Sequence, residues 1–415
     1  MSAMRNYVLV TLAYWAFTLT DGALRMLVLL HFHELGYTPV QLAFLFLFYE
    51  LFGVVTNLLG GWLAARLGLR VTLLSGLALQ VVALGMLSFV APRWPVAVSV
   101  AYVMGAQALS GIAKDLTKMS SKSSIKVLVP DDARSSLFKW VAILTGSKNA
   151  LKGAGFFLGG LLLSALGFRG SLWSMAGALV LVLLGCVLSL PADMGKAKTK
   201  AKFSTILSKT RAINILAAAR FFLFGARDIW FVVGVPVFLS VQLGWGFTQV
   251  GAFLASWVVG YGAIQSLAPA IIRRWTKGHA PQGRAALVLA LLLAATSAAM
   301  AVGIVSGASP AVMLIAGLGV FGAIFAVNSS VHSYLILAYS DGDQVAMNVG
   351  FYYMANAGGR LVGTLLSGAL YQLAGLAGCL WGTVGFAALT AAISTMLPQK
   401  DSAVIAPGIQ LDGGD

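Results

Sequence analysis

The sequence predicts an all-α polytopic membrane protein with about twelve transmembrane helices. Apolar residues make up 59% of the 415 positions and charged residues only 10%, and apolar runs of about twenty residues recur between Gly, Pro or charged positions. An ordinary soluble domain has about 25% charged residues. Because one water-soluble core cannot enclose so much apolar surface, a bilayer must cover part of it.

The apolar runs give the helices in chain order. The predicted spans are 7–32, 39–63, 71–91, 94–118, 138–166, 171–190, 213–240, 248–272, 285–305, 311–338, 345–371 and 376–397. The first run contains Asp21 and Arg25 and has no small-residue cleavage site, so we expect it to remain as a helix and not to be removed as a signal peptide. The 47 glycines suit this architecture because small residues let transmembrane helices approach closely.

The charges between the spans predict the orientation. With the N-terminus in the cytosol, the external loops hold only Arg93 and Arg169, while the cytosolic segments hold the other Lys and Arg residues that lie between spans. The positive-inside rule therefore predicts that both termini are cytosolic. Most of the net charge of +15 is then topological, and it requires no nucleic-acid partner.

The longest hydrophilic stretch follows the sixth predicted helix. It divides the chain into an N-terminal six-helix bundle (1–190), a basic cytosolic linker (191–212), a C-terminal six-helix bundle (213–400) and a flexible tail (401–415). An offset of 203 residues aligns Arg25 with Asp228 and Arg70 with Arg273, which indicates a weak internal repeat. Two parallel six-helix repeats are typical of the major facilitator fold.

A short motif follows the second predicted helix. Residues 61–70, GWLAARLGLR, resemble the G-x-x-x-D-R-x-G-R-[RK] signature of the major facilitator superfamily. The gate residues that it predicts are Gly61, Arg66, Gly68 and Arg70. Glycine allows a close helix contact and a tight turn, and the basic residues are expected to bind acidic or helix-end partners. Ala65 stands in place of the acid of the signature and Leu69 in place of a basic residue, which weakens the predicted gate.

Eight basic and four acidic residues fall within the predicted spans. The basic residues are Arg25, Lys114, Lys118, Lys148, Lys152, Arg220, Arg227 and Arg360. The acidic residues are Asp21, Glu50, Asp115 and Asp228. A charge at the bilayer centre costs about 2.5–3.5 kcal/mol on the insertion scale, so we expect these side chains to face a watery cavity.

The spacing of the cations predicts shared helix faces. The pairs are Lys114 with Lys118, Lys148 with Lys152, and Arg220 with Arg227. The excess of cations predicts an anion site, because Arg binds phosphate, carboxylate or arsenate oxyanions in bidentate fashion and Lys adds a mobile charge. Two alternatives remain open. The lysines nearest the cytosol could extend to the interface, and Asp21 with Arg25 could form an internal ion pair.

Acids at membrane depth are candidates for proton coupling. Desolvation favours the neutral carboxyl and so permits proton exchange at Asp21, Glu50 and Asp228. Glu50 is the first candidate because no cation lies within one helical turn of it along the chain, although a structural hydrogen bond is an equal alternative. The sequence contains no G-x-x-x-x-G-K-[ST] motif, so ATP-driven transport is not expected.

Catalytic and metal-binding patterns do not emerge from the sequence. Cys186 and Cys379 are far apart, and the four histidines have no ligand spacing. Residues 317–322 match G-x-G-x-x-G but lie within an apolar run, which favours helix packing. We therefore expect a monomeric transporter without cofactor or metal, and not an enzyme. A cation-drug antiporter would need an excess of acids, and a channel agrees less well with two repeats.

Several longer segments resemble one family more closely. The segments 13–39, 108–126, 144–160 and 208–233 resemble organoarsenical efflux permeases of the ArsJ type. The resemblance implies a bacterial inner-membrane permease that exports 1-arseno-3-phosphoglycerate and confers arsenate resistance. A separate glyceraldehyde-3-phosphate dehydrogenase makes that compound, and proton antiport is the expected coupling. Export or exchange of another phosphorylated metabolite is the alternative.

Two cationic clusters match a substrate with an oxyanion at each end. From spacing we expect Arg25, Lys148 and Lys152 to bind one end and Arg220, Arg227 and Arg360 to bind the other. Rocking of the two halves would then give alternating access.

Overall fold

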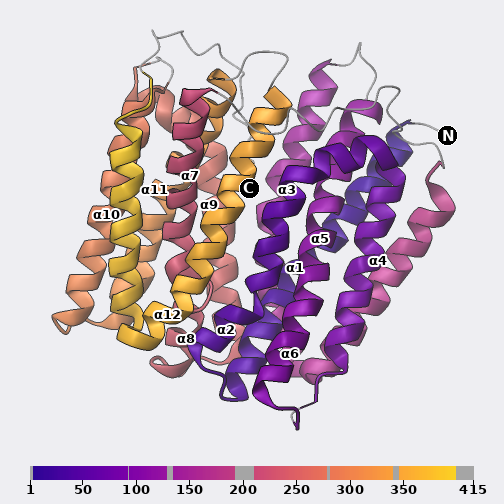
Figure 1. Ribbon diagram of the computed structural model, residues 1–415, viewed down its shortest axis with the longest axis horizontal. Helices are drawn as coiled ribbons and strands as arrows, with labels where there is room; N and C mark the ends of the chain where they lie inside the picture. The colour runs from indigo at the N-terminus through magenta and orange to yellow at the C-terminus, as the bar shows by residue number, and fades with distance from the viewer. Residues whose placement is uncertain are drawn as a thin grey trace. The chain divides into compact units, whose positions relative to one another are not determined.

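The computed structural model describes residues 3–91, 93–128, 134–191, 210–277, 281–339 and 345–398. Within these ranges every regular element is helical, as predicted (Figure 1). The helices are α1 (Ala3–Glu34), α2 (Pro39–Leu45), α3 (Leu47–Leu67), α4 (Leu69–Ser88), α5 (Val96–Leu128), α6 (Arg134–Ser189), α7 (Arg211–Phe231), α8 (Gly234–Val241), α9 (Phe247–Trp275), α10 (Gly283–Val305), α11 (Pro310–Ala338) and α12 (Val345–Ser394).

Nine stretches within the described residues are long and apolar enough to cross a membrane. Two of them lie in the kinked helices α6 and α12, which therefore each supply two spans. The kinks lie at Gly167 (φ 65°) and at Gly375 (φ 61°), where the absence of a Cβ permits left-handed backbone. The sequence predicted breaks at both places. The prediction of an all-helical polytopic fold is confirmed.

The described helices group into two compact units. Unit 1 comprises Met1–Tyr37, Phe44–Ser204 and Gly246–Ala255, and unit 2 comprises Thr38–Ala43, Thr205–Trp245 and Ser256–Asp415. Two short segments belong to the unit that is formed mainly by the other half of the sequence: Thr38–Ala43 to unit 2 and Gly246–Ala255 to unit 1. The predicted six-helix bundles contain no such segments. Most of the predicted linker 191–212 and the whole of the tail 401–415 lie outside the described residues.

Close helix contacts in unit 1 depend on glycine. A Cβ on Gly111 of α5 would lie 2.5 Å from the carbonyl oxygen of Tyr49 in α3. A Cβ on Gly155 of α6 would lie 2.5 Å from the carbonyl oxygen of Leu19 in α1. Both distances are too short for any larger residue, so these glycines set the separation of the helices that carry the charged side chains.

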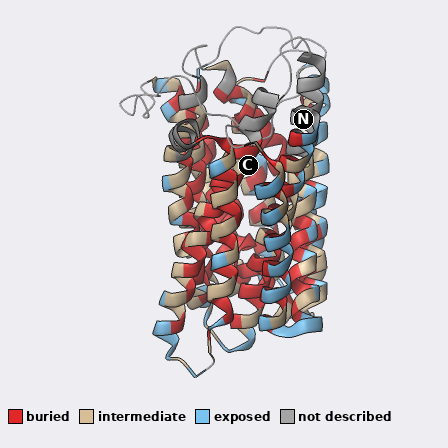
Figure 2. Ribbon diagram, turned by 90° about the vertical axis from the view of Figure 1, so that its right-hand side faces the viewer, coloured by how far each residue is buried: buried red, intermediate tan, exposed pale blue. Residues whose placement is uncertain are grey.

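Helix α7 lies at the core of unit 2. Its buried residues include Arg220, Arg227 and Asp228. An aromatic cluster surrounds its end, with the Trp230 ring 5.2 Å from that of Trp257 and 5.3 Å from that of Phe321. Buried and exposed residues fall on different faces of the helices (Figure 2). The charges on α7 are thus held inside a tightly packed apolar frame.

Candidate functional site

The first charged group in unit 1 joins α1 to α3. Arg25 Nη2 lies 3.1 Å from Glu50 Oε1, and the Glu50 side chain is only 1% exposed. The Arg25 guanidinium also lies 5.3 Å from the centre of the Phe46 ring and 5.6 Å from that of Tyr49, within cation–π range. Glu50 therefore has a cationic partner, contributed by a different helix from its own.

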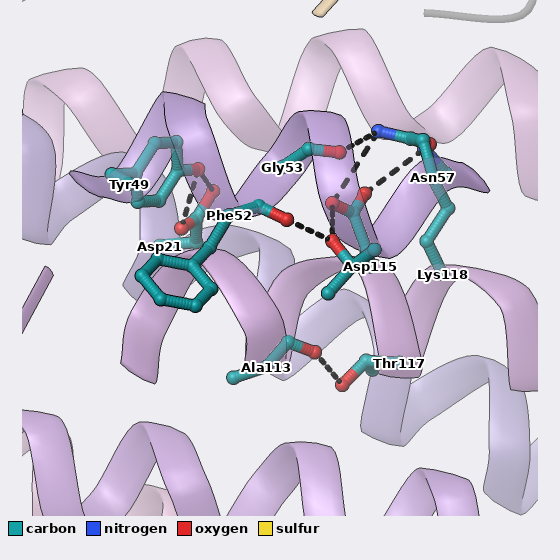
Figure 3. A network of polar contacts seen from close by, with 10 residues as sticks. Asp21, Tyr49, Phe52, Gly53, Asn57, Ala113, Asp115, Thr117 and Lys118 are labelled. Atoms are coloured by element: carbon teal, nitrogen blue, oxygen red, sulfur yellow. Dashed lines mark hydrogen bonds and ion pairs between the residues drawn. The ribbon is translucent and has the colours of Figure 1, made fainter. Parts of the chain in front are cut away.

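Asp21 lies one helical turn before Arg25 and binds Tyr49. The Tyr49 hydroxyl donates toward both carboxylate oxygens of Asp21, at 2.9 and 3.0 Å (Figure 3). Lys114 Nζ lies 4.2 Å from the centre of the Tyr49 ring. Lys114, Lys152 and Arg25 all interact electrostatically with Asp21. The fold thus gathers three of the predicted substrate-binding cations around one carboxylate.

A second network in unit 1 surrounds Asp115, whose side chain is 0% exposed. Its carboxylate accepts hydrogen bonds from Thr56 Oγ1 at 2.7 Å and from Lys118 Nζ at 3.1 Å. Lys118 Nζ also donates to Asn57 Oδ1 at 2.8 Å (Figure 3). The Lys118 ammonium is therefore bound between α5 and α3.

Helix α6 contributes the two remaining cations of unit 1. Lys152 Nζ lies 5.9 Å from the centre of the Phe156 ring. Lys148 is partly exposed and follows Ser147, whose hydroxyl accepts a 2.8 Å hydrogen bond from Trp15 Nε1 of α1. This bond holds the Lys148 turn against the helix that carries Asp21 and Arg25.

In unit 2 one carboxylate binds two arginines. Asp228 Oδ1 lies 2.7 Å from Arg227 Nε, and Asp228 Oδ2 lies 3.1 Å from Arg360 Nε. The Arg227 guanidinium also lies 4.9 Å from the centre of the Phe224 ring. Asp228 thus fixes Arg227 on α7 and Arg360 on α12 relative to each other.

Arg220 occupies a fully buried position two turns before Arg227. Its Nε donates to Asn356 Oδ1 at 2.9 Å, and its Nη1 donates to the carbonyl and hydroxyl oxygens of Ser329 at 3.2 and 3.1 Å. Its guanidinium lies 3.8 Å from the centre of the Phe224 ring. Neutral oxygens and an aromatic face together hold this cation.

Three carboxylates share one arrangement. The side chains of Glu50, Asp115 and Asp228 are 0–1% exposed, whereas those of the cations they bind are 9–15% exposed. Each acid therefore holds its cation from the more buried side and leaves the cation as the more accessible group. Among the charges singled out from the sequence, cations exceed acids by two in each unit. Such an arrangement can bind anions.

The gate motif is described only in part. Gly68 precedes α4 with φ 86°, the left-handed backbone expected for its tight turn. Arg70 Nη2 donates to the Val187 carbonyl in the last turn of α6 at 2.8 Å. Both residues belong to unit 1. The side-chain environments of Gly61 and Arg66 lie outside the described residues.

Sequence analysis did not single out Tyr49, Asn57 or Asn356. Tyr49 directly precedes Glu50, and the two asparagines interrupt apolar runs. Polar side chains within a span are a usable signal, because each needs a partner at membrane depth. Only their contacts with Asp21, Lys118 and Arg220 reveal their place in the charged clusters.

Comparison with known proteins gives two findings. A family model described as the Major Facilitator Superfamily matches residues 9–329. The crystal structure of the nucleoside transporter NupG, as a D323A mutant, superposes with a TM-score of 0.70 at 15% identity, covering 94% of this chain and 98% of that one. An identity this low supports the fold alone. The search of curated proteins returned no match.

Proposed function

Because this chain belongs to the major facilitator superfamily, we propose that it exports a small organic polyanion by alternating access. It is a multi-pass membrane transporter and not an enzyme. The proposed cargo is 1-arseno-3-phosphoglycerate, and the proposed location is a bacterial inner membrane with both termini in the cytosol. The proposed role is arsenate resistance.

The observation that carries this proposal is the excess of cations at membrane depth. Among the charged residues that fall within the predicted spans, each unit has two more cations than acids. Phosphate and arsenate groups each carry more than one negative charge and accept bidentate hydrogen bonds from Arg. Arg25, Lys148 and Lys152 are proposed to bind one oxyanion, and Arg220, Arg227 and Arg360 the other.

The choice of cargo depends on sequence resemblance as well as on charge. Charge supports any compact polyanion, including other phosphorylated metabolites. The segments 13–39, 108–126, 144–160 and 208–233 resemble ArsJ-type permeases and favour the arsenylated product. A glyceraldehyde-3-phosphate dehydrogenase is the proposed functional partner, because it would supply that product.

The driving force for export can be a coupled proton or the membrane potential itself. Protonation of Glu50 would remove the charge that balances Arg25, so proton and anion would favour each other locally. An antiporter requires the two to exclude each other, so this pair gives proton antiport no support. The inside-negative membrane potential favours exit of an anion by about 2.3 kcal/mol per charge per 100 mV. Proton antiport through Asp21, Glu50 or Asp228 remains a prediction, which proton movement during export would test.

Everted membrane vesicles test the proposal directly. The external medium contains arsenate, glyceraldehyde-3-phosphate, the oxidised nicotinamide cofactor and the dehydrogenase, and arsenic inside the vesicles is measured. We expect saturable accumulation only with the complete mixture and with this chain in the membrane. Accumulation without the dehydrogenase would refute the arsenylated product as the cargo. A pH indicator inside the vesicles reports the direction of any coupled proton movement.

A further inference from the structure

Two buried polar side chains in α11 have no role in the charged clusters. Asn328 and His332 are both 0% exposed. Neither the amide oxygen and nitrogen of Asn328 nor the two ring nitrogens of His332 have a hydrogen-bond partner among the described residues. A buried polar group without a partner costs about 1–3 kcal/mol. Four such atoms on adjacent turns of one helix therefore call for a ligand or a functional explanation.

Both side chains lie on the face of α11 that meets Arg220. Phe325, Asn328, Ser329 and His332 follow the spacing i, i+3, i+4 and i+7, which places them on one helix face. Ser329 accepts two hydrogen bonds from Arg220 Nη1, and His332 interacts electrostatically with Arg220. The neighbouring face carries the apolar cluster residues Val327, Val331 and Leu335. The polar atoms thus extend the environment of a predicted substrate-binding cation.

The chemistry of these atoms restricts what they recognise. Asn328 offers a donor and an acceptor, and a neutral His332 offers one of each. An oxyanion alone accepts hydrogen bonds and would leave the acceptors unmatched, whereas a hydroxyl group both donates and accepts. We infer that Asn328 and His332 form a subsite that binds a hydroxyl group of the organic anion whose charge Arg220 balances. This inference rests on the proposed function and deepens it.

The subsite is enclosed in the present conformation, since Asn328, His332 and Arg220 are all 0% exposed. Ligand entry therefore belongs to another conformation of the transport cycle. A cluster of water molecules could satisfy the same four atoms, but water would not discriminate between two anions that differ by one hydroxyl group. Discrimination between two such anions therefore tests whether the subsite binds a hydroxyl group or only water.

The probes are 3-phosphoglycerate and 3-phosphonooxypropanoate, the same molecule without its hydroxyl group. Their dissociation constants are measured by calorimetry on the purified full chain in lipid nanodiscs. We expect the hydroxylated anion to bind the wild-type chain at least about tenfold more tightly, because its loss leaves buried polar atoms unmatched. The variants Asn328→Leu and His332→Phe should reduce this ratio to within about twofold. The matched control Thr11→Val changes a buried polar atom of unit 1 that also has no partner among the described residues, and should retain the ratio.

The outcomes separate this inference from the proposed function. Equal binding of the two anions by the wild-type chain, or a ratio retained in both variants, would overturn the subsite and leave the polyanion proposal intact. Binding of neither anion would also overturn the subsite, and accumulation of arsenic in the everted vesicles then decides the polyanion proposal separately. The wild-type ratio decides the question even if a variant fails to fold, and thermal unfolding of each variant reports folding independently.

Discussion

Asp228 offers the sharpest test of how the cations are held. Its carboxylate is 1% exposed and binds Arg227 and Arg360 at 2.7 and 3.1 Å, while the two arginine side chains are 10% and 14% exposed. Removing one partner of a buried ion pair costs about 3–5 kcal/mol, because the remaining charge is left uncompensated. Because the Asp228 carboxylate binds two guanidinium groups, we expect Asp228→Asn to lower the free energy of unfolding by an amount near the upper end of that range.

The assay is equilibrium unfolding of the purified chain in mixed micelles. Asp228→Asn, Arg360→Gln and the double variant form a thermodynamic cycle, and we expect the double variant to lose about 1–3 kcal/mol less than the sum of the single losses. Arg70→Gln is the control, because its exposed bond to the Val187 carbonyl should contribute about 1 kcal/mol or less. If the losses of unfolding free energy were additive in the cycle, or if Asp228→Asn lost as little as the control, Asp228 would not hold Arg227 and Arg360 together as the structure indicates.

Three further predictions concern unit 1. Gly111→Ala places a methyl group 2.5 Å from the Tyr49 carbonyl oxygen and should destabilise the chain by about 1–3 kcal/mol. Gly105→Ala on the same helix meets nothing within 4 Å and should leave the free energy of unfolding unchanged or raise it slightly in the same assay. Tyr49→Phe removes the donor to the Asp21 carboxylate and should cost about 1.5–3 kcal/mol of unfolding free energy; an unchanged value would contradict that bond. Glu50→Gln tests proton coupling directly: a flattened pH dependence of export in vesicles would assign the coupled proton to Glu50, whereas normal export at every pH would exclude Glu50 and agree with its pairing to Arg25.

Hydrophobic runs and break residues were sufficient to predict the fold class. The turns between the spans 138–166 and 171–190, and between 345–371 and 376–397, coincide with kinks at Gly167 and Gly375. A span is a local property of about twenty residues, so sequence patterning specifies it. The placement of Thr38–Ala43 in unit 2 depends on contacts between residues far apart in the sequence, and hydrophobic patterning does not encode such contacts.

Sequence patterning can identify the charged residues within the spans, but it does not reveal how they pair. Charge within apolar runs identified Arg25, Glu50 and Asp228 because such charges are costly at membrane depth. The sequence suggested Asp21 as a partner for Arg25, since the two are one turn apart, whereas the 3.1 Å contact of Arg25 is with Glu50. That pairing depends on the packing of α1 against α3 and requires three-dimensional structure.

Arsenic retention in living cells tests the proposed export most directly. Arsenic-sensitive bacteria carry this chain, a glyceraldehyde-3-phosphate dehydrogenase, both or neither, and both arsenate tolerance and intracellular arsenic are measured. The host's own dehydrogenase is controlled by repeating the assay in a strain with reduced activity of that enzyme. Export of the arsenylated product predicts high tolerance and low intracellular arsenic only where chain and enzyme are present together. Unchanged tolerance and retention in every strain, with the chain confirmed in the membrane, would contradict the arsenical assignment.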